Sequence, residues 1–351
     1  MKHTNEPHSL PRGRLLWSGL FLLIAAATIW AVTSQSRSFS LSQFVEYLSH
    51  ASAAWIAAAV LCMLGFILFE GEAIVTVCRA FGHPTGHKRG FIYSAADLYF
   101  SAITPSATGG QPACAWFMIK DGMPGMVTTV ALLLNLTMYT ASILILGLLA
   151  LLICPSVFLN FGIPSKILIG IGAVIQTSLA TFLLLLLRKR ELLHKICRTA
   201  LHILCKLHLL RQEEEKQRKL DASMAEYAEY AGMISGHGKA VVKVLVLHLL
   251  QRACFIAVPV FVFLASGGAV ADAPAIWAMQ CFCVIGSTFV PIPGAMGVTD
   301  YLMLDVYGSI LQNAVQFELL SRALSFYLCI ILCGVTVLIK LWTMKARQNQ
   351  P

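Results

Sequence analysis

The stretch ITPSATGGQPA, from Ile103 to Ala113, interrupts a chain that is otherwise built from long apolar runs. It places two prolines, two glycines and three hydroxyl side chains directly beside hydrophobic segments. Proline and glycine break helices, and inside a membrane every backbone N–H or C=O that a break frees must find a partner. The stretch is therefore either a solvated loop or part of a site.

The rest of the sequence has the composition of a polytopic membrane protein. Hydrophobic residues make up 58% of the 351 residues and charged residues 12%, and the mean hydropathy is +0.75. A water-soluble domain with this balance would lack the polar surface to cover itself. We therefore expect an all-α fold. Apolar runs near the spanning length of about 20 residues predict seven spans, at Leu15–Val32, Ala51–Phe69, Val127–Cys154, Ile167–Leu187, Val241–Ala265, Ala275–Val290 and Ala323–Ile339.

Lysine and arginine residues near the ends of spans indicate the orientation in the membrane. They precede the first span and follow the second, fourth and last spans, whereas the loops Thr33–His50, Pro155–Ser165 and Ser266–Pro274 carry few of them. Both termini are therefore predicted to be cytoplasmic, which requires an even number of crossings. The broken segment Pro291–Gly308 is the best candidate for one more crossing, which makes about eight transmembrane helices.

A polar segment divides the membrane part into two halves. Residues 188–239 hold eleven Lys and Arg and seven Asp and Glu, with apolar residues at helical spacing. This pattern predicts a cytoplasmic helical insert between a first membrane half, 1–187, and a second, 240–351. We expect the basic part of the insert, Arg188–Lys219, to lie along the anionic inner leaflet. A solvated helical connector is the alternative that the sequence leaves open.

Each membrane half carries one interrupted element. Pro105 is followed four residues later by Gly109, and Pro293 is followed four residues later by Gly297. Paired breaks of this kind are typical of discontinuous helices around a central binding site. We predict re-entrant elements at 103–120 and 290–308, with tips that meet near the middle of the membrane. A helix N-terminus attracts phosphate, so we expect N–H groups for an anion at Ser106, Thr108, Gly109, Gly110, Gly294 and Gly297.

Few ionisable residues lie at membrane depth in the first half and in the fifth span. A charge there costs at least about 2.5–3.5 kcal/mol on insertion scales, so it usually faces a partner or a wet cavity. Asp97 precedes the first break, and Glu70 and Glu72 lie near the end of the second span. Arg252, inside the fifth span, has the forked geometry that suits phosphate or carboxylate. A structural ion pair with an acid such as Asp300 is the alternative role for Arg252.

Polar residues also surround the second break. Arg322 opens the last span, with Glu318 one turn before it, and Asp300 directly follows the break. We therefore expect a cluster of these three residues at that break. Asn135 stands in apolar surroundings, where a neutral amide is expected to link helices rather than to bind a ligand.

Signatures of soluble enzymes are absent from the sequence. It contains no P-loop, no dinucleotide fingerprint, no nucleophile elbow, no HExxH and no CxxC. Most of the eleven cysteines fall in apolar runs, and none has histidines at metal-ligand spacing. We expect them to pack as small hydrophobic residues, and we expect no disulfide, metal, cofactor or nucleic-acid partner. A homo-oligomer is left open.

Several motifs together resemble a known family. FSAITPSATGGQPACAWFMIKDGMP, with LFEGEAI upstream and VPIPGAMGVTDYLML and LLSRALSFYL downstream, is similar to the lysylphosphatidylglycerol synthase transmembrane-region family. The resemblance covers most of the chain, from Ala51 to Lys340. This family forms the membrane half of the multiple peptide resistance factor proteins and also occurs as stand-alone chains. It implies a bacterial cytoplasmic-membrane protein with two re-entrant elements and a cavity for a phospholipid.

Full-length members of that family couple a soluble aminoacyl-transferase domain, which makes lysyl-phosphatidylglycerol, to a membrane half that moves the product to the outer leaflet. This chain ends eleven residues after Lys340, so we expect no transferase domain and do not carry over the synthase activity. Many members have an acidic residue where this chain has Gln111. The neutral amide weakens the case for binding a cationic headgroup at this position. By the motif match, Gly109, Gly110 and Gln111 fall in the first re-entrant element. The second contains Pro293, Gly294, Gly297 and Asp300, and Arg322 lies on the helix that follows it.

The favoured function is flippase-like translocation, or binding, of a phospholipid in the cytoplasmic membrane, with aminoacylated phosphatidylglycerol or another lipid as the substrate. Arg252, Arg322 and the N–H groups of both breaks would hold the phosphate. Asp97, Glu72 and Asp300 would balance those charges or hold an amine headgroup.

Two other function classes stay open. An intramembrane lipid-modifying enzyme, related to the phosphatidylglycerol lysyltransferases, would use Asp97 and Asp300 as its acid and base. A non-transporting partner subunit would act through the basic segment Arg188–Lys219.

Overall fold

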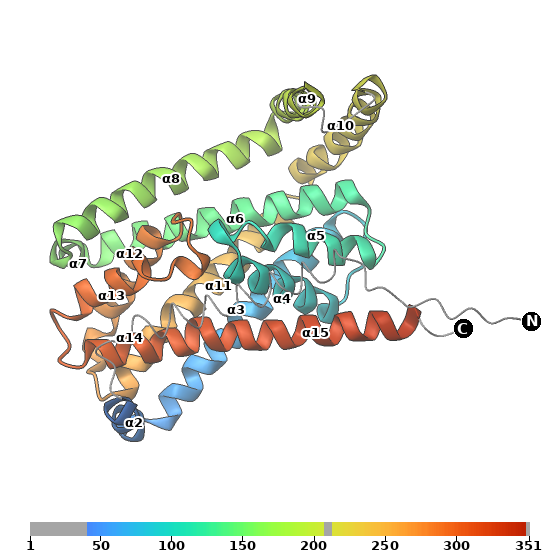
Figure 1. Cartoon of the computed structure of the whole chain (residues 1–351). Helices are drawn as coiled ribbons and strands as arrows, with labels where there is room; N and C mark the ends of the chain where they lie inside the picture. Colours follow the sequence, from blue (N-terminus) through green and yellow to red (C-terminus); the bar gives the residue numbers. More distant parts are fainter. Residues whose placement is uncertain (1–40, 207–212, 349–351) are drawn as a thin grey trace, which may run out of the picture. The chain divides into compact units, whose positions relative to one another are not determined.

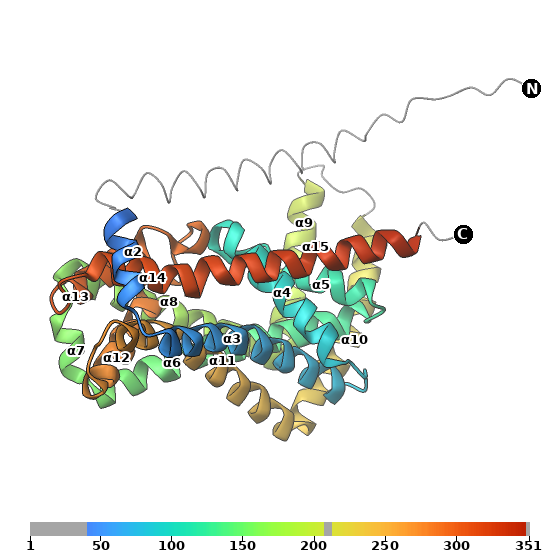
Figure 2. The ribbon, with the colours of Figure 1, turned by 90° about the horizontal axis from the view of Figure 1, so that it is seen from below.

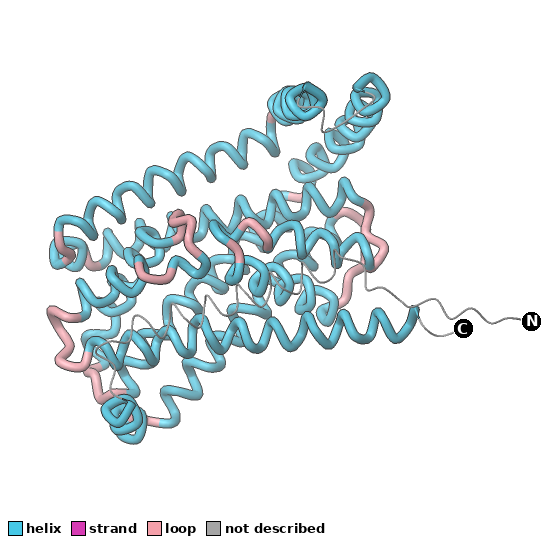
Figure 3. Tube along the Cα trace, in the orientation of Figure 1, coloured by secondary structure: helices cyan, strands magenta, loops and turns pink. Residues whose placement is uncertain are grey.

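Helices account for every regular element in the residues that the structure describes, 41–206 and 213–348 (Figure 3). The expected all-α fold is confirmed. The computed structural model divides the chain into two units, Met1–Val45 and Glu46–Pro351, with the boundary inside helix α2 (Leu41–His50). The first predicted span, Leu15–Val32, lies outside the described residues.

Within the described residues, six helices are long and apolar enough to cross a membrane, in agreement with the other six predicted spans. The apolar run of the second span ends at Phe69, but its helix continues to Ala80. Glu70, which ends the apolar run in the sequence, is buried inside the bundle and does not end the helix. The six are α3 (Ala53–Ala80), α6 (Gly125–Ile153), α8 (Ile163–Arg188), α11 (Gly238–Ala265), η2 (Val270–Asp272) with α12 (Ala273–Ser287), and α14 (Ala314–Arg322) with α15 (Leu328–Gln348).

The first break forms the tip of a helical hairpin. Helix α4 (His87–Ile103) leads to a short turn, η1 (Pro105–Ala107), and α5 (Gly110–Lys120) returns beside α4 (Figure 1). At the base of the hairpin the Tyr93 hydroxyl donates a hydrogen bond to Asp121 over 3.1 Å. The re-entrant element therefore begins at His87, earlier than the predicted 103, because α4 itself is its first arm.

The second break forms a matching hairpin. Helix α12 leads to η3 (Pro293–Ala295), and α13 (Val298–Tyr307) returns, so that the Tyr307 hydroxyl donates to the Ile276 carbonyl at 3.3 Å. Helix α13 has ten residues, which is about 15 Å or half of the hydrocarbon thickness. The predicted crossing at Pro291–Gly308 is therefore wrong: this segment turns back, and the hairpin begins before residue 290, with α12.

The tips of the two hairpins pack against each other through η1 and η3. This confirms the prediction that the two breaks meet. Both tips use the same backbone device, because Ala107 has φ 53° and Ala295 has φ 49°. These alanines occupy the same place in two Pro-x-Ala-x-Gly segments, so the resemblance between the breaks extends to their local conformation.

Glycines let the hairpin arms approach the long helices closely. A Cβ atom on Gly172 of α8 would lie 2.1 Å from the carbonyl oxygen of Ile285 in α12. A Cβ atom on Gly71 of α3 would lie 2.7 Å from the backbone of Gly90 in α4. Helices α3 and α11 pack along each other (Figures 1 and 2). Each hairpin is thus held against a full-length helix by backbone contact.

The closing helix contacts both hairpins. Helix α14 passes through a π-helical turn, η4 (Ala323–Tyr327), directly into α15. Near the end of α15, Lys340 Nζ lies 2.7 Å from Asp121 Oδ1 at the base of the first hairpin. At the other end, the Phe326 ring fills the space where a Cβ atom on Gly294 would lie.

The polar insert is helical, as predicted. It consists of α9 (Arg190–Lys206) and α10 (Glu213–Gly236), which are linked by His194 Nε2 and Asp221 Oδ1 at 2.7 Å. The Tyr227 hydroxyl donates to the Leu186 carbonyl at 3.0 Å and so ties α10 to α8. Burial raises the pKa of Tyr227 to about 12, so the hydroxyl remains a donor at neutral pH. The short helix α7 (Pro155–Asn160) connects α6 to α8.

Substituting Gly172→Ala should destabilise the protein, because the new methyl group meets the α12 backbone, which cannot move aside. Overpacking of this kind costs about 1–3 kcal/mol and should lower the melting temperature of the purified protein in detergent. Gly170→Ala, on the same helix, is the matched control, since nothing lies within 4 Å of its Cβ position. Equal melting temperatures for the two variants would contradict the close α8–α12 contact.

Candidate functional site

Two adjoining cavities lie where the hairpin tips meet. The first has a volume of about 420 Å³ and is lined by residues of α3, α4, α5, α6, α8 and α11. The second, of about 180 Å³, lies between the second hairpin and Arg322. Five residues line both cavities, namely Ser101, Ala107, Tyr139, Arg252 and Thr288. Arg252 therefore lies at the junction of the two.

Arg252 is a buried cation without an ion-pair partner in the part of the chain that the structure describes. Its side chain is 5% exposed, and its guanidinium carbon lies 4.0 Å from the centroid of the Tyr139 ring, with Phe66 and Phe255 at 5.0 and 5.6 Å. Its Nε has no hydrogen-bond partner among the described residues. Aromatic rings stabilise a guanidinium in part, but they do not accept hydrogen bonds from its N–H groups as an anion would. Arg252 is therefore a ready donor to an anion in either cavity.

Two carboxyl groups face each other in the first cavity. Glu70 on α3 is 3% exposed, Asp97 on α4 is 5% exposed, and the two side chains are in hydrogen-bond contact. Gln251 donates to Glu70 over 2.8 Å, and Gln111 donates to Asp97 over 2.7 Å. Ser101 also donates to Asp97, at 3.2 Å. We call Glu70 and Asp97 the acid pair.

Gly110 permits the approach of α5 to the acid pair. A Cβ atom at this position would lie 2.1 Å from Asp97 Oδ1 and 2.0 Å from the Ser101 hydroxyl. With no side chain at Gly110, the first turn of α5 can bring Gln111 onto Asp97. The amide of Gln111 thus binds the acid pair, while the residue also lines the cavity.

A chain of polar side chains leads from the acid pair across the bundle. Behind Glu70, the Gln251 amide oxygen lies 2.8 Å from His248 Nδ1, and His248 Nε2 lies 2.8 Å from the Asn135 amide on α6. Because Gln251 turns its NH₂ to Glu70, its amide oxygen accepts a hydrogen bond from His248 Nδ1, while His248 Nε2 faces the amide oxygen of Asn135. Asn135 therefore links helices, as predicted, and it also lines the first cavity.

The predicted cluster at the second break is present. Arg322 Nε lies 3.0 Å from Asp300 Oδ1, and Arg322 Nη2 donates to the Gly294 carbonyl at 3.3 Å. Glu318 is in contact with Asp300 and close to the Arg322 charge. Asp300 is thus paired with Arg322 and not with Arg252. Arg322 lines the second cavity, whereas Asp300 lines neither.

A family model described as the lysylphosphatidylglycerol synthase TM region matches residues 17–333. The chain belongs to this family. The resemblance in the motifs is thereby confirmed, and the chain is a multi-pass membrane protein of a family involved in lipid handling. A search of curated proteins gives no match.

In this member of the lysylphosphatidylglycerol synthase TM family, side chains already occupy two of the N–H groups expected to hold an anion. The Gly109 N–H donates to the Thr104 hydroxyl, and the Gly297 N–H donates to Asp300 Oδ2, both at 2.9 Å. These two N–H groups are therefore already bound by nearby side chains. Arg252 and Arg322 are the stronger candidates for binding an anion. Pro105 and Pro293 each begin the short turn at a tip.

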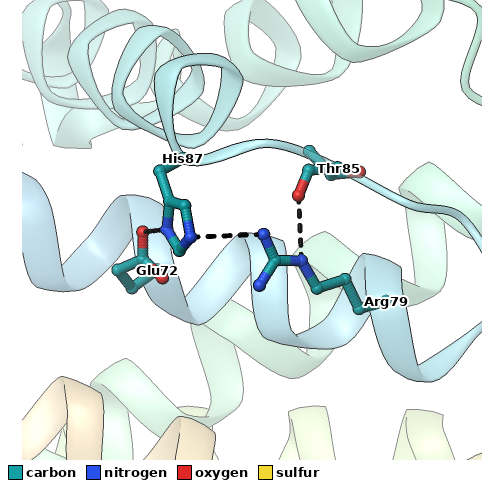
Figure 4. A network of polar contacts seen from close by, with 4 residues as sticks. All are labelled: Glu72, Arg79, Thr85 and His87. Carbon is teal, nitrogen blue, oxygen red and sulfur yellow. Dashed lines mark hydrogen bonds and ion pairs between the residues drawn. The ribbon is translucent and has the colours of Figure 1, made fainter.

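Glu72 lies away from both cavities. Figure 4 shows it beside His87, its hydrogen-bond partner at the start of α4, with Arg79 reaching His87 and the Thr85 carbonyl. This network joins the end of α3 to the first hairpin. Residues two apart on a helix point to nearly opposite sides, so only Glu70 of the two glutamates reaches the cavity.

Sequence reasoning missed Gln251 and the role of Tyr139, and it gave Glu72 more weight than Glu70. The available signal was the spacing of His248, Gln251 and Arg252, which places three polar side chains on one turn of an apolar helix. No pattern in the sequence shows which aromatic ring would stack on Arg252. Among the described residues no group of three or more His, Cys, Asp or Glu side chains is placed to hold a metal ion.

Substituting Arg322→Gln should be strongly destabilising, because it leaves Asp300 and Glu318 in contact without a cation. Removing one partner of a buried ion pair costs about 3–5 kcal/mol. The double variant Arg322→Gln/Asp300→Asn should recover part of this loss, since the new amide would keep an oxygen for the Gly297 N–H. Thermal unfolding of the purified variants measures both effects. A double variant no more stable than the single one would contradict the charge cluster, and Arg89→Gln, at an exposed position, controls for loss of an arginine.

Proposed function

We propose that this protein binds a phospholipid through its phosphate group in the two adjoining cavities and moves it between the leaflets of the bacterial cytoplasmic membrane. The observation that carries the proposal is Arg252, a buried guanidinium that forms no direct ion pair with a carboxylate among the described residues. A guanidinium matches the geometry of a phosphate group with two parallel hydrogen bonds. Arg322 also lines the second cavity and adds a second positive charge.

The walls of the first cavity favour a lipid over a water-soluble anion. Ile175 and Leu179 on α8 line it, yet they are 40% and 37% exposed. In a membrane, exposed apolar side chains on a spanning helix face acyl chains. The mouth of the cavity is therefore open to lipid, so a headgroup can enter while the acyl chains stay in the bilayer.

The opposite charges in the site suit a headgroup that carries both a phosphate and an amine. Arg252 offers positive charge, and the acid pair offers negative charge in the same cavity. Aminoacylated phosphatidylglycerol has a complementary group for each. Glu72 and Asp300, which were considered for the amine, lie outside the cavity lining.

The two hairpins support movement between leaflets. Their returning arms, α5 and α13, have only 11 and 10 residues, and their tips meet around the cavities. A change in the tilt of either hairpin would open the site to one leaflet, as in transporters built from discontinuous helices. Net transport needs a ligand or ion with different affinity for the two states; without one the protein equilibrates lipid between leaflets.

The insert would bring the protein into contact with the inner leaflet. Lys195 and Arg198 are exposed on α9, and lysine and arginine near an anionic membrane surface are attracted to it. The insert and both termini would then be cytoplasmic. An enzyme that uses Asp97 and Asp300 as acid and base is not favoured, because Asp300 does not line the cavities.

Leaflet exchange in liposomes tests the function. Purified full-length protein, reconstituted with fluorescent phosphatidylglycerol and with an aminoacylated form, should accelerate exchange relative to protein-free vesicles. No acceleration for any headgroup would overturn the proposal. Arg252→Gln should slow the exchange by about ten-fold or more, because a hydrogen bond to a charged group contributes about 1.5–3 kcal/mol.

The matched control is Arg89→Gln, which removes an exposed arginine of α4 that lines neither cavity. It should leave the exchange rate unchanged. Equal rates for Arg252→Gln and Arg89→Gln would show that Arg252 does not bind the transported lipid.

A further inference from the structure

The first cavity contains three charged side chains among the residues that line it: Glu70, Asp97 and Arg252. All three are more than nine-tenths buried. Each carboxyl group receives an amide N–H from one side, from Gln251 or from Gln111. On the other side the two carboxyl groups face each other. The acid pair is therefore held in place by groups that cannot neutralise it.

Charge balance determines how many protons the pair holds. Two ionised carboxylates in contact in a buried site repel each other, and one shared proton removes the repulsion. With that proton the pair carries one negative charge, which Arg252 balances across the cavity. The empty site is then electrically neutral.

A phosphate group at Arg252 disturbs this balance. A phosphodiester adds one negative charge, and an uncompensated charge in a buried site costs several kcal/mol. The compensating charge has to reach the acid pair, because the pair carries the remaining negative charge near Arg252. A second proton would supply it, and so would an ammonium group on the lipid headgroup itself.

We infer that the acid pair takes up one positive charge for each phosphate that Arg252 binds. The charge is a proton when the headgroup has no amine, and it is the headgroup ammonium when there is one. The inference rests on the proposed function and adds to it a rule of charge balance. It makes binding of an anionic phospholipid proton-linked, while binding of a lipid with one ammonium group is not.

Other titratable groups near the pair do not replace it in this role. His248 is committed through both ring nitrogens to Gln251 and Asn135. Among the described residues, the remaining titratable groups that interact with the pair from the surrounding helices are Arg252 on α11, Cys329 and Cys333 on α15, Cys114 on α5 and Tyr139 on α6. None of these five carries a second negative charge to be neutralised at neutral pH.

Calorimetric titration of the purified full-length protein tests the inference. Short-chain phosphatidylglycerol, phosphatidylethanolamine and lysyl-phosphatidylglycerol are added in buffers of different ionisation enthalpy, which gives the number of protons bound with each lipid. We expect uptake of about one proton for phosphatidylglycerol, no proton for phosphatidylethanolamine, and release of up to one proton for lysyl-phosphatidylglycerol, which brings two ammonium groups. Raising the pH through the titration of the pair should weaken phosphatidylglycerol binding about ten-fold per pH unit. Equal proton uptake for all three lipids would overturn the inference.

The double variant Glu70→Gln/Asp97→Asn removes the negative charge and keeps the shape of both side chains. It should bind phosphatidylglycerol without proton uptake and bind the amine-bearing lipids more weakly. Glu72→Gln, outside the cavity, is the matched control and should behave as the unaltered protein. If the double variant does not fold, the difference in proton uptake between the three lipids on the unaltered protein still tests the inference.

The result also separates this inference from the proposed function. Leaflet exchange with equal proton uptake for all headgroups would leave the proposed function standing and reject the charge rule. Failure to bind any of the lipids would reject both.

Discussion

The contact between the two hairpin tips is the constraint on which the rest of this structure depends. A helix that ends halfway across a membrane leaves backbone donors without partners, in a place where water cannot supply them. Here Thr104 caps the Gly109 N–H and Asp300 caps the Gly297 N–H. Because the ends are capped from within, they can meet beside each other and leave polar cavities between them. The long helices then serve to hold the arms at the right depth.

The same constraint explains how the charges are distributed. Asp300 and Arg322 stabilise a tip, so their pairing is structural even though Arg322 also lines the second cavity. Arg252 and the acid pair are arranged differently, because they share the first cavity without forming an ion pair with each other. Amide side chains contact the acid pair, and aromatic rings contact Arg252.

Much of this arrangement could be predicted from the sequence, because it depends on local signals. Hydropathy located the six long helices of the described region, and the prolines and glycines located the two tips. The direction of the chain after a break is not a local property, so the requirement for an even number of crossings assigned one to Pro291–Gly308. The choice between Glu70 and Glu72 depends on how α3 is rotated, which is set by its packing against α11 and α4. No single stretch of sequence contains that information.

The π-helical turn at Ala323–Tyr327 gives the closing helix a mechanical role. Arg322, just before the turn, and Phe326, within it, touch the tip of the second hairpin, and Lys340 on α15 forms an ion pair at the base of the first. One rod therefore connects both hairpins. A π turn carries one extra residue, which lets a helix bend or slip without losing its hydrogen-bonded continuity. Such a rod would convert movement at the membrane surface into movement at the tips, so that the two hairpins respond together.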